Sequence, residues 1–545
     1  MKNLPKLLIQ KFLKKMESVK HKKLLSLITL LFISSSTVFA AFHFSSSLQK
    51  TSEPTIVNTS KKDGSANGTT TTGGTSSSST TKNNQPSSPG GNTPSTATTS
   101  THSSPSGSTA PSTATGNQQP TPGDTSLNYS RIQWEGGSSY WSRFPKSNAA
   151  GWTNPNFFPI TIFYGKADPT YVASLKDAGI NTFAPPEHDP STFPITNITD
   201  QGMYVIGNIN EYTPAEVGAS NNRVVGWFMS DECDMGYSGC DNGTSGQTAS
   251  NYATSVDQSY VNKARSYNDG RFVMANFGNG ILRTFWASYN AASPPYILSV
   301  APTDMHAHMQ MMDVTSADKY TYTSPAVDGI VPNSPDWPIN APVARAYSYG
   351  WQADQIKRFQ DTAHPKPIWT FIETAMPYLT EQGARTIQPD QIEGAVWSAI
   401  IHEARGISYF DHNNNGICGN YAIVNCPNVH AKVKQIDTQV AEMAPVLNTQ
   451  SYYNTQVTIN GMTYSRFSFN NGTDTMLKTY NSYAYIIAGL GFGDATGDKS
   501  FTLPNSVNGT SVEVMDEKRT LPVTNRSFTD NFSSEYAHHI YKIAM

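Results

Sequence analysis

One stretch decides the fold: Val224-Val225-Gly226-Trp227-Phe228-Met229-Ser230-Asp231-Glu232. It is an apolar run that ends in two adjacent carboxylates, and a continuous apolar run is typical of a parallel strand buried on both faces. Residues 367–373 repeat this form and end at Glu373. A carboxylate inside such a strand would be buried and unpaired, which is costly. At the C-terminal end of the strand it would instead face the pocket that the βα loops of a barrel form.

The sequence around these two runs alternates strands with helices. We expect strands at 158–164, 180–183, 203–208, 224–229, 272–276, 312–318, 367–373 and 406–410. Helices are expected at 169–178, with Asp168 as N-cap, and at 260–267, 390–404 and 429–447. Alternating units predict a parallel sheet, and eight of them fit a closed (β/α)8 TIM barrel. A doubly wound open sheet is the alternative, but the chain lacks the glycine-rich phosphate turn expected after an early strand.

Glu232 and Glu373 fall at the ends of the predicted fourth and seventh strands. The C-terminal ends of barrel strands meet at one rim, so both carboxyl groups are expected there. Retaining glycosidases use two carboxyl groups about 5–5.5 Å apart, one as acid/base and one as nucleophile. Each glutamate could alternatively cap a helix or form a surface ion pair, but two at matching strand ends favour a catalytic pair.

The segments 226–232 and 369–373 resemble the corresponding parts of clan A glycoside hydrolases, and the resemblance spans about residues 150–446. It implies a retaining (β/α)8 enzyme with Glu232 as acid/base and Glu373 as nucleophile. Residues 316–320 look like the end of that clan's sixth strand, where an aromatic often supports the nucleophile, which implies this role for Tyr320. Residues 404–410 are similar to the start of its eighth strand.

Two positions depart from the clan's pattern. Asp231 stands where asparagine usually precedes the acid, and Phe410 or Asp411 stands at the usual eighth-strand tryptophan. Asp231 could therefore be the acid itself, with Glu232 supporting it. The departures also motivate an alternative function, a non-catalytic surface glycan-binding protein on a glycosidase-like barrel.

Other residues at predicted strand ends are candidate substrate contacts: Asp231, Asn276, Asp318, Tyr320 and Trp369. For Asn276, Asp318 and Trp369 the alternative is a hydrogen-bonding residue of the barrel rim or a core residue. Glu187 and Glu211 follow earlier strands and could line subsites.

No cofactor or metal is expected. Residues 411–416 resemble the opening of a calcium loop, but the twelfth position is Ala422 instead of the bidentate glutamate that the motif requires. His306 and His308 suggest a metal-dependent hydrolase as a third function class, although the barrel prediction places them in a loop before the sixth strand.

The four cysteines favour two disulfides, Cys233–Cys240 and Cys418–Cys426, because each pair spans a short polar loop in a chain that we expect to be exported. A four-cysteine zinc site is the alternative, but the spacing matches no standard zinc motif.

The N-terminus predicts export. Residues 1–44 hold a lysine-rich start and then an uncharged apolar run from residue 24, which indicates a signal peptide cleaved after Ala40 or an uncleaved membrane anchor. Residues 45–125 are rich in Ser, Thr, Gly and Pro, a composition that cannot bury a core, and we expect a disordered tether. The protein is therefore expected to be secreted or surface-attached, with the membrane contacted only through this segment.

Composition narrows the possible partners. The formal net charge is −3, only 14% of residues are charged, and no basic stripe is present, which argues against nucleic acid as a partner. The expected partner is a poly- or oligosaccharide substrate, and the chain is expected to be a monomer.

The catalytic barrel is expected over residues 126–448, and residues 449–545 change to short alternating strands. A hairpin at 457–464 turns at Asn460-Gly461, and further strands are expected at 483–488, 500–503, 511–515 and 538–543. This pattern predicts a small antiparallel β-sandwich that packs against the barrel or binds glycan.

Overall fold

The structure is a computed structural model that describes residues 126–240, 254–282 and 302–545, apart from short gaps at 325–326, 329–330, 335–336, 339, 378–382, 415, 417, 460–461 and 494. The predicted targeting segment and tether, residues 1–125, lie outside the described residues. Within the described part of the chain, no helix is both long and apolar enough to cross a lipid bilayer.

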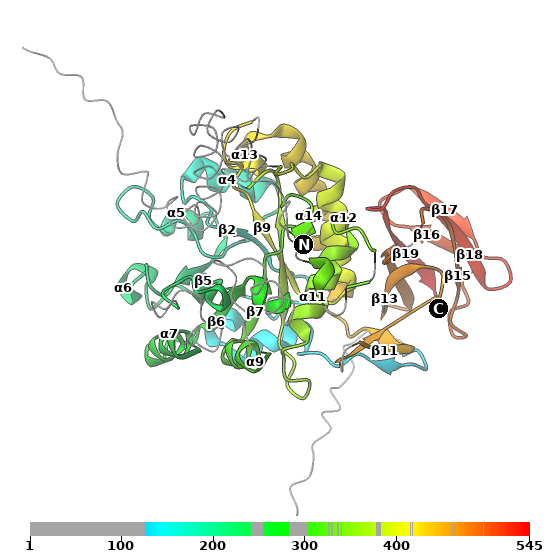
Figure 1. The fold of residues 1–545 in the computed structure, drawn as a ribbon, viewed down its shortest axis with the longest axis horizontal. Helices are drawn as coiled ribbons and strands as arrows, with labels where there is room; N and C mark the ends of the chain where they lie inside the picture. The colour runs from blue at the N-terminus through cyan, green and yellow to red at the C-terminus, as the bar shows by residue number, and fades with distance from the viewer. Residues whose placement is uncertain are drawn as a thin grey trace, which may run out of the picture. The chain divides into compact units, whose positions relative to one another are not determined.

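Residues 160–410 form a closed barrel of parallel strands (Figure 1). Its strands are β2 (Ile160–Phe163), β3 (Thr182–Phe183), β4 (Tyr204–Asn208), β5 (Val224–Asp231), β6 (Phe272–Phe277), β7 (Val314–Ala317), β8 (Ile368–Glu373) and β9 (Gly406–Phe410). Parallel pairing of β2 with β9 closes the ring. The predicted (β/α)8 barrel is confirmed.

Helices on the outside cover the barrel. The longer ones are α4 (Pro169–Asp177), α7 (Thr254–Ser266), α9 (Pro302–Met311), α11 (Tyr347–Lys357), α12 (Pro389–Ile401) and α14 (Pro427–Leu447). The side chain of Asp168 accepts hydrogen bonds from the backbone of Thr170 and Tyr171, which confirms the predicted N-cap. The loop predicted for His306 and His308 is wrong, because both residues lie on α9, where His308 is buried against Asp257.

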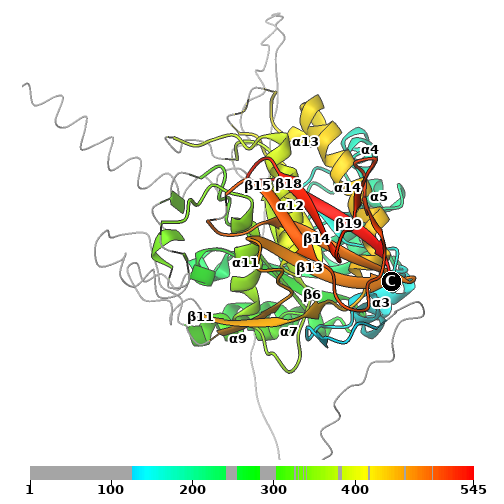
Figure 2. The same ribbon diagram turned by 90° about the vertical axis from the view of Figure 1, so that its right-hand side faces the viewer.

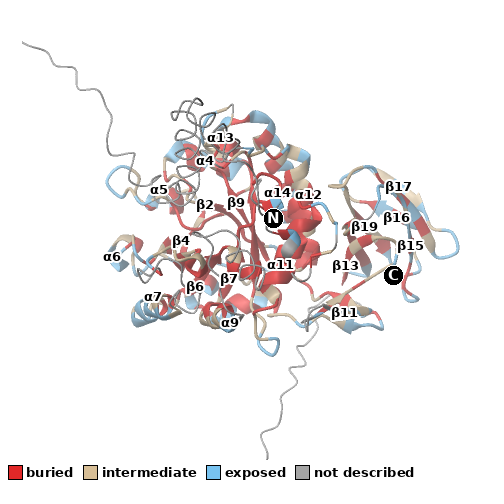
Figure 3. Ribbon diagram, viewed as in Figure 1, coloured by how far each residue is buried: buried red, intermediate tan, exposed pale blue. Residues whose placement is uncertain are grey.

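The core has two layers (Figure 3). Inside the barrel, alternate strand residues point inward, so Trp369 and Phe371 of β8 pack with Phe228, Phe272 and Met274. The outward residues pack against the helices, as Ile372 of β8 does.

The C-terminal region is an antiparallel β-domain (Figure 2). Its main sheet has the order β1-β10-β13-β14-β19-β16-β17. These strands span β1 (Ser130–Arg131), β10 (Tyr452–Tyr453), β13 (Thr473–Tyr480), β14 (Tyr483–Leu490), β16 (Ser511–Val514), β17 (Arg519–Pro522) and β19 (His538–Ala544). Two small two-stranded antiparallel sheets complete the domain: the hairpin of β11 (Thr455–Ile459) with β12 (Met462–Arg466), and β15 (Gly497–Thr502) with β18 (Ser527–Phe532).

The domain boundary predicted at 448 is crossed by one strand. β1 lies ahead of the barrel in the chain, yet Ser130 pairs with Tyr453 and Arg131 with Tyr452 in the β-domain sheet. Leu127 packs in the core of the β-domain as well. The β-domain is therefore built from both ends of the described chain.

Polar side chains join the barrel to the β-domain. His402, which follows α12, lies between Asp354 of α11, at 2.9 Å from Nδ1, and Asp474 of β13, at 3.3 Å from Nε2. Glu535 accepts hydrogen bonds from the backbone N–H of Ala346 and from the Tyr322 hydroxyl. The predicted packing of the β-domain against the barrel is present.

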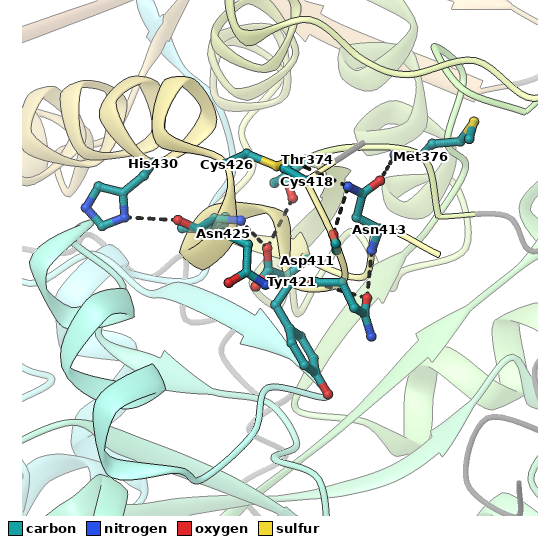
Figure 4. The surroundings of a disulfide bond; sticks show 12 residues. Thr374, Met376, Asp411, Asn413, Cys418, Tyr421, Asn425, Cys426 and His430 are labelled. Carbon is teal, nitrogen blue, oxygen red and sulfur yellow. Dashed lines mark hydrogen bonds between the residues drawn. A yellow bond between two sulfur atoms is a disulfide. The ribbon is translucent and has the colours of Figure 1, made fainter. Parts of the chain in front are cut away.

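Both predicted disulfides, Cys233–Cys240 and Cys418–Cys426, are formed. Figure 4 shows Asp411 beside the second disulfide. The Asp411 carboxyl accepts hydrogen bonds from the Tyr171 hydroxyl and the Ile423 backbone N–H, and Asn413 accepts one from the Met376 backbone N–H. The side-chain oxygens of Asp411 and Asn413 are thus used to fix the loop.

Candidate active site

Glu232 follows β5 directly, at the C-terminal rim of the barrel. The β5–β6 ladder shifts register between Phe228 and Asp231, and the Glu232 backbone N–H then donates to the Asn276 carbonyl at 2.9 Å. Glu232 adopts a left-handed backbone with φ of 50°. Such a conformation costs a non-glycine residue about 1–3 kcal/mol and persists only where the surroundings impose it. The strained backbone aims a side chain that is 7% exposed.

Hydrogen bonds of Asp234 join the loop that follows β5 to the loop that follows β6. Asp234, which is fully buried, accepts hydrogen bonds from the backbone N–H groups of Gly278 at 2.9 Å and Gly280 at 2.6 Å. A Cβ on Gly278 would lie 2.6 Å from Glu232 Oε1, which is closer than atoms can pack. The absence of a side chain at position 278 therefore makes room for the Glu232 carboxyl group.

Lys319 and Asp318 lie next to Glu232 at the end of β7. Lys319 Nζ is 3.7 Å from Glu232 Oε1 and 3.9 Å from Asp318 Oδ1, and Asp318 also hydrogen-bonds to Glu232. The side chain of Gln352 on α11 bonds both the backbone N–H and the carbonyl of Lys319. Asp318 thus lies beside Glu232, its role as a substrate contact stays a prediction, and Lys319 had no predicted role.

Glu373 ends β8 and is fully buried. The Tyr349 hydroxyl lies 2.7 Å from each of its carboxylate oxygens, and the Thr323 hydroxyl donates to Oε1 at 3.2 Å. Sequence reasoning had expected Tyr320 as this donor, but the Tyr320 ring packs inside the barrel, with its centroid 5.4 Å from that of Phe410. Tyr349 comes from α11, so no strand-end motif pointed to it.

Two further candidates, Asp231 and Asn276, form a buried network with Ser316 at the rim. Asp231 Oδ1 accepts from Asn276 Nδ2 at 2.9 Å, and Asn276 Oδ1 accepts from the Ser316 hydroxyl at 3.0 Å. Asn276 is fully buried, so here it supports Asp231 and does not contact solvent.

Trp369 was expected to contact substrate but is a core residue in this structure. It is fully buried and lies on the same inward face as Glu373, four residues earlier on β8. At a rise of about 3.3 Å per residue, this places it roughly 13 Å back along the strand from Glu373, towards the bottom of the barrel.

Glu187 and Glu211 lie outside this network. The Glu187 carboxyl accepts a hydrogen bond from the Tyr421 hydroxyl at 2.7 Å. Glu211 Oε2 is buried and has no hydrogen-bond partner among the described residues, and burial raises its pKa.

Burial dominates the electrostatics of the site. It raises the pKa of Asp231 to about 7, with a further contribution from the Glu232 charge, and it raises the pKa of Glu373 to about 7 against the opposing Tyr349 hydrogen bond. Burial also raises the pKa of Glu232, and Lys319 opposes this rise. The pKa of Asp318 is raised first by burial and then by the Glu232 charge. Burial therefore shifts these carboxyl groups towards their protonated forms.

No family model matches the chain, and no curated protein sequence matches it. Among solved structures, the chain is similar to a protein described as a glycoside hydrolase, at 10% identity and a TM-score of 0.42, with 71% of this chain and 92% of that chain covered. It is also similar to a GH30 endoxylanase from Clostridium papyrosolvens, at 12% identity and a TM-score of 0.38, with 77% of this chain and 98% of that chain covered. A third similar structure is a glycoside hydrolase family 5 protein from Bacteroides vulgatus, at 10% identity and a TM-score of 0.40, with 71% of this chain and 89% of that chain covered. The chain has the TIM-barrel fold, and its function is argued below from the site.

Proposed function

We propose that the protein is a glycoside hydrolase that cleaves a poly- or oligosaccharide, with Glu373 as nucleophile and Glu232 as acid/base. The observation that carries the proposal is that the carboxyl groups of Glu232, directly after β5, and of Glu373, at the end of β8, both lie at the C-terminal ends of barrel strands, each held by its own polar neighbours. Carboxyl groups at this rim of a barrel occupy the place where barrel enzymes do their chemistry.

In the proposed retaining reaction, the Glu373 carboxylate attacks the anomeric carbon while the Glu232 carboxyl group protonates the departing glycosidic oxygen. Water then attacks the glycosyl–Glu373 ester, and Glu232 takes a proton from that water, which restores both groups. The Tyr349 and Thr323 hydroxyls orient the nucleophile. Burial supplies the raised pKa that an acid requires near neutral pH.

The Lys319 ammonium group gives the acid/base a defined electrostatic neighbour. It stabilises the ionised form of Glu232, which is the form needed to accept a proton from water in the second step. Asp234 has the opposite effect, because its negative charge raises the Glu232 pKa and so favours the protonated form. Opposing neighbours of this kind suit a group that must be acid in one step and base in the next.

The test is hydrolysis of a panel of aryl glycosides and soluble polysaccharides by the native chain and by Glu373→Gln and Glu232→Gln variants. Both variants should lose about 100-fold to 10,000-fold in kcat, the usual contribution of general acid–base catalysis, because each removes a group that takes part in bond making or breaking. Glu442→Gln, which changes an exposed glutamate of α14, is the matched control and should keep full activity.

A 2-deoxy-2-fluoro glycoside should then label Glu373, as peptide mass spectrometry would show. Native turnover by Glu373→Gln would refute the assignment of the nucleophile. Binding of saccharides by the native chain without any release of sugar would support the alternative, a glycan-binding barrel.

We also propose that the protein acts outside the cytoplasm. The two disulfides support this location, because cytoplasmic proteins seldom keep structural disulfides. Fractionation of cells that produce the full chain would test it, and recovery of the protein only from the cytoplasm would refute it.

A further inference from the structure

A cavity of about 260 Å³ lies between the barrel and the β-domain, away from the barrel rim. Its barrel wall is formed by residues of α12 and α14, and its other wall by residues 515–517 and 533–540. We call this cavity the interdomain groove.

Ion pairs hold the charged side chains of the groove in place. Lys432 Nζ lies 2.9 Å from Asp390 and 2.6 Å from Glu393, both on α12. On the opposite wall, Glu517 accepts from Arg519 Nε at 2.7 Å. The walls are therefore fixed before a ligand arrives, which reduces the entropy that binding would cost.

Two polar side chains in the groove offer hydrogen-bonding atoms without a protein partner. Gln439 is 7% exposed and lines the groove; its Oε1 accepts from Trp397 Nε1 at 3.2 Å, and its Nε2 makes no hydrogen bond to another described residue. His538 stacks on Trp397 with an interplanar angle of 13°. Its Nε2 is 3.9 Å from Glu393 Oε1, which is beyond hydrogen-bond distance. An amide donor left unpaired in so buried a position is costly unless a ligand or water satisfies it.

The chemistry of the walls narrows the class of ligand. Asp390, Glu393, Asp516 and Glu517 surround the groove and would repel an anion. Among the described residues, no three acidic, histidine or cysteine groups at the groove come close enough together to hold a metal ion. Burial lowers the pKa of His538 to about 3, so its ring is neutral and can both donate and accept. Carboxylate acceptors, an amide donor and a neutral imidazole together suit a ligand with many hydroxyl groups.

We propose that the interdomain groove is a second carbohydrate-binding site, which holds a neutral polysaccharide chain apart from the barrel rim. The hydroxyl groups of the saccharide would donate to the carboxylates and accept from Gln439 Nε2, and Tyr536 in the wall offers an aromatic ring. The choice of a saccharide among neutral polyhydroxyl ligands rests on the proposed function.

The test is affinity electrophoresis of the full chain through gels that contain β-glucan, arabinoxylan or galactomannan. The Glu373→Gln variant is used throughout, so that the polymer is not cut during the run. At least one polymer should retard it. Adding Gln439→Glu, which keeps an acceptor for Trp397 but removes the amide donor, should weaken the retardation at least fivefold. Ser533→Trp, at an exposed position of the wall, should do the same by filling the groove.

Gln258→Ala, an exposed change on α7 of the barrel, is the matched control and should leave the retardation unchanged. A thermal unfolding midpoint within a few degrees of the parent shows that a groove variant is folded. Absence of retardation by every polymer would overturn the proposal, and so would equal retardation of both groove variants and the parent. A native chain that binds through the groove but releases no sugar would overturn the proposed hydrolase and leave the groove standing, since the two readouts are separate.

Discussion

Substitution of Tyr349 provides the sharpest test of what sets the pKa of Glu373. Its hydroxyl lies 2.7 Å from both carboxylate oxygens, a geometry that only the ionised carboxylate uses fully. A hydrogen bond to a charged group contributes about 1.5–3 kcal/mol. Tyr349→Phe removes this preference for the ionised form, so the Glu373 pKa should rise above its present value of about 7. Since about 1.4 kcal/mol corresponds to one pH unit, the acid limb of activity should move upward by roughly one to two pH units.

The assay is the profile of kcat/KM against pH, from 5 to 9.5, for an aryl glycoside that the native chain cleaves. The nucleophile must be deprotonated, so native activity should fall as pH drops through about 7. The Tyr349→Phe variant should lose roughly tenfold or more at pH 7 and recover part of this loss at pH 9. Tyr347→Phe is the matched control, because this tyrosine lies on the same helix and donates to the Pro342 carbonyl instead. An acid limb that stays in place in Tyr349→Phe, or moves to lower pH, would refute the reasoning.

Three further predictions follow from the same geometry. Lys319→Met removes the ammonium group that favours ionised Glu232, so the alkaline limb of the same profile should move to higher pH; a shift to lower pH would contradict this. Gly278→Ala places a Cβ 2.6 Å from Glu232 Oε1 and should lower kcat at least tenfold, whereas native kcat would show that the carboxyl group can shift freely. Burial alone would lower the His402 pKa, but Asp354 and Asp474 raise it to about 9, above the unfolded value of about 6.5. The contribution of protonated His402 to the free energy of unfolding is therefore fully present below about pH 6.5 and is lost as pH rises through about 9. It amounts to at most about 3 kcal/mol. Urea unfolding of His402→Gln should accordingly show a stability deficit at pH 6 that shrinks by pH 10, and a deficit independent of pH would argue against the charge effect.

The barrel was accessible from sequence because its strands are buried on both faces. Such strands are short continuous apolar runs, and all of them were predicted near their observed positions. β13 was missed for a related reason: its residues Met476–Thr479 are all buried, since the strand lies between the β-domain core and helices α12 and α14. The expected alternation of apolar and polar residues is therefore lost, and Lys478 is buried within the strand.

The site was predictable where it depends on strand ends and not where it depends on helices. Glu232, Glu373 and Asp318 follow apolar runs directly, so the sequence indicated them. Tyr349 reaches Glu373 from α11, and only the packing of that helix against β8 brings the two together. For Trp369 the strand was predicted correctly, but the sequence does not show how deep in the barrel each residue of that strand lies.

The pairing of β1 with β10 has a consequence for how the chain is made. Ser130 is synthesised before the barrel, yet its partner Tyr453 leaves the ribosome more than three hundred residues later. β1 therefore has no partner strand until the whole barrel has been translated. Contacts between residues so distant in sequence form slowly. The β-domain is then the last part of the protein to close, and it fastens the two ends of the barrel together. A chain cut at residue 448 would lack the sheet that β1 joins, so the barrel and the β-domain cannot be exchanged as independent modules.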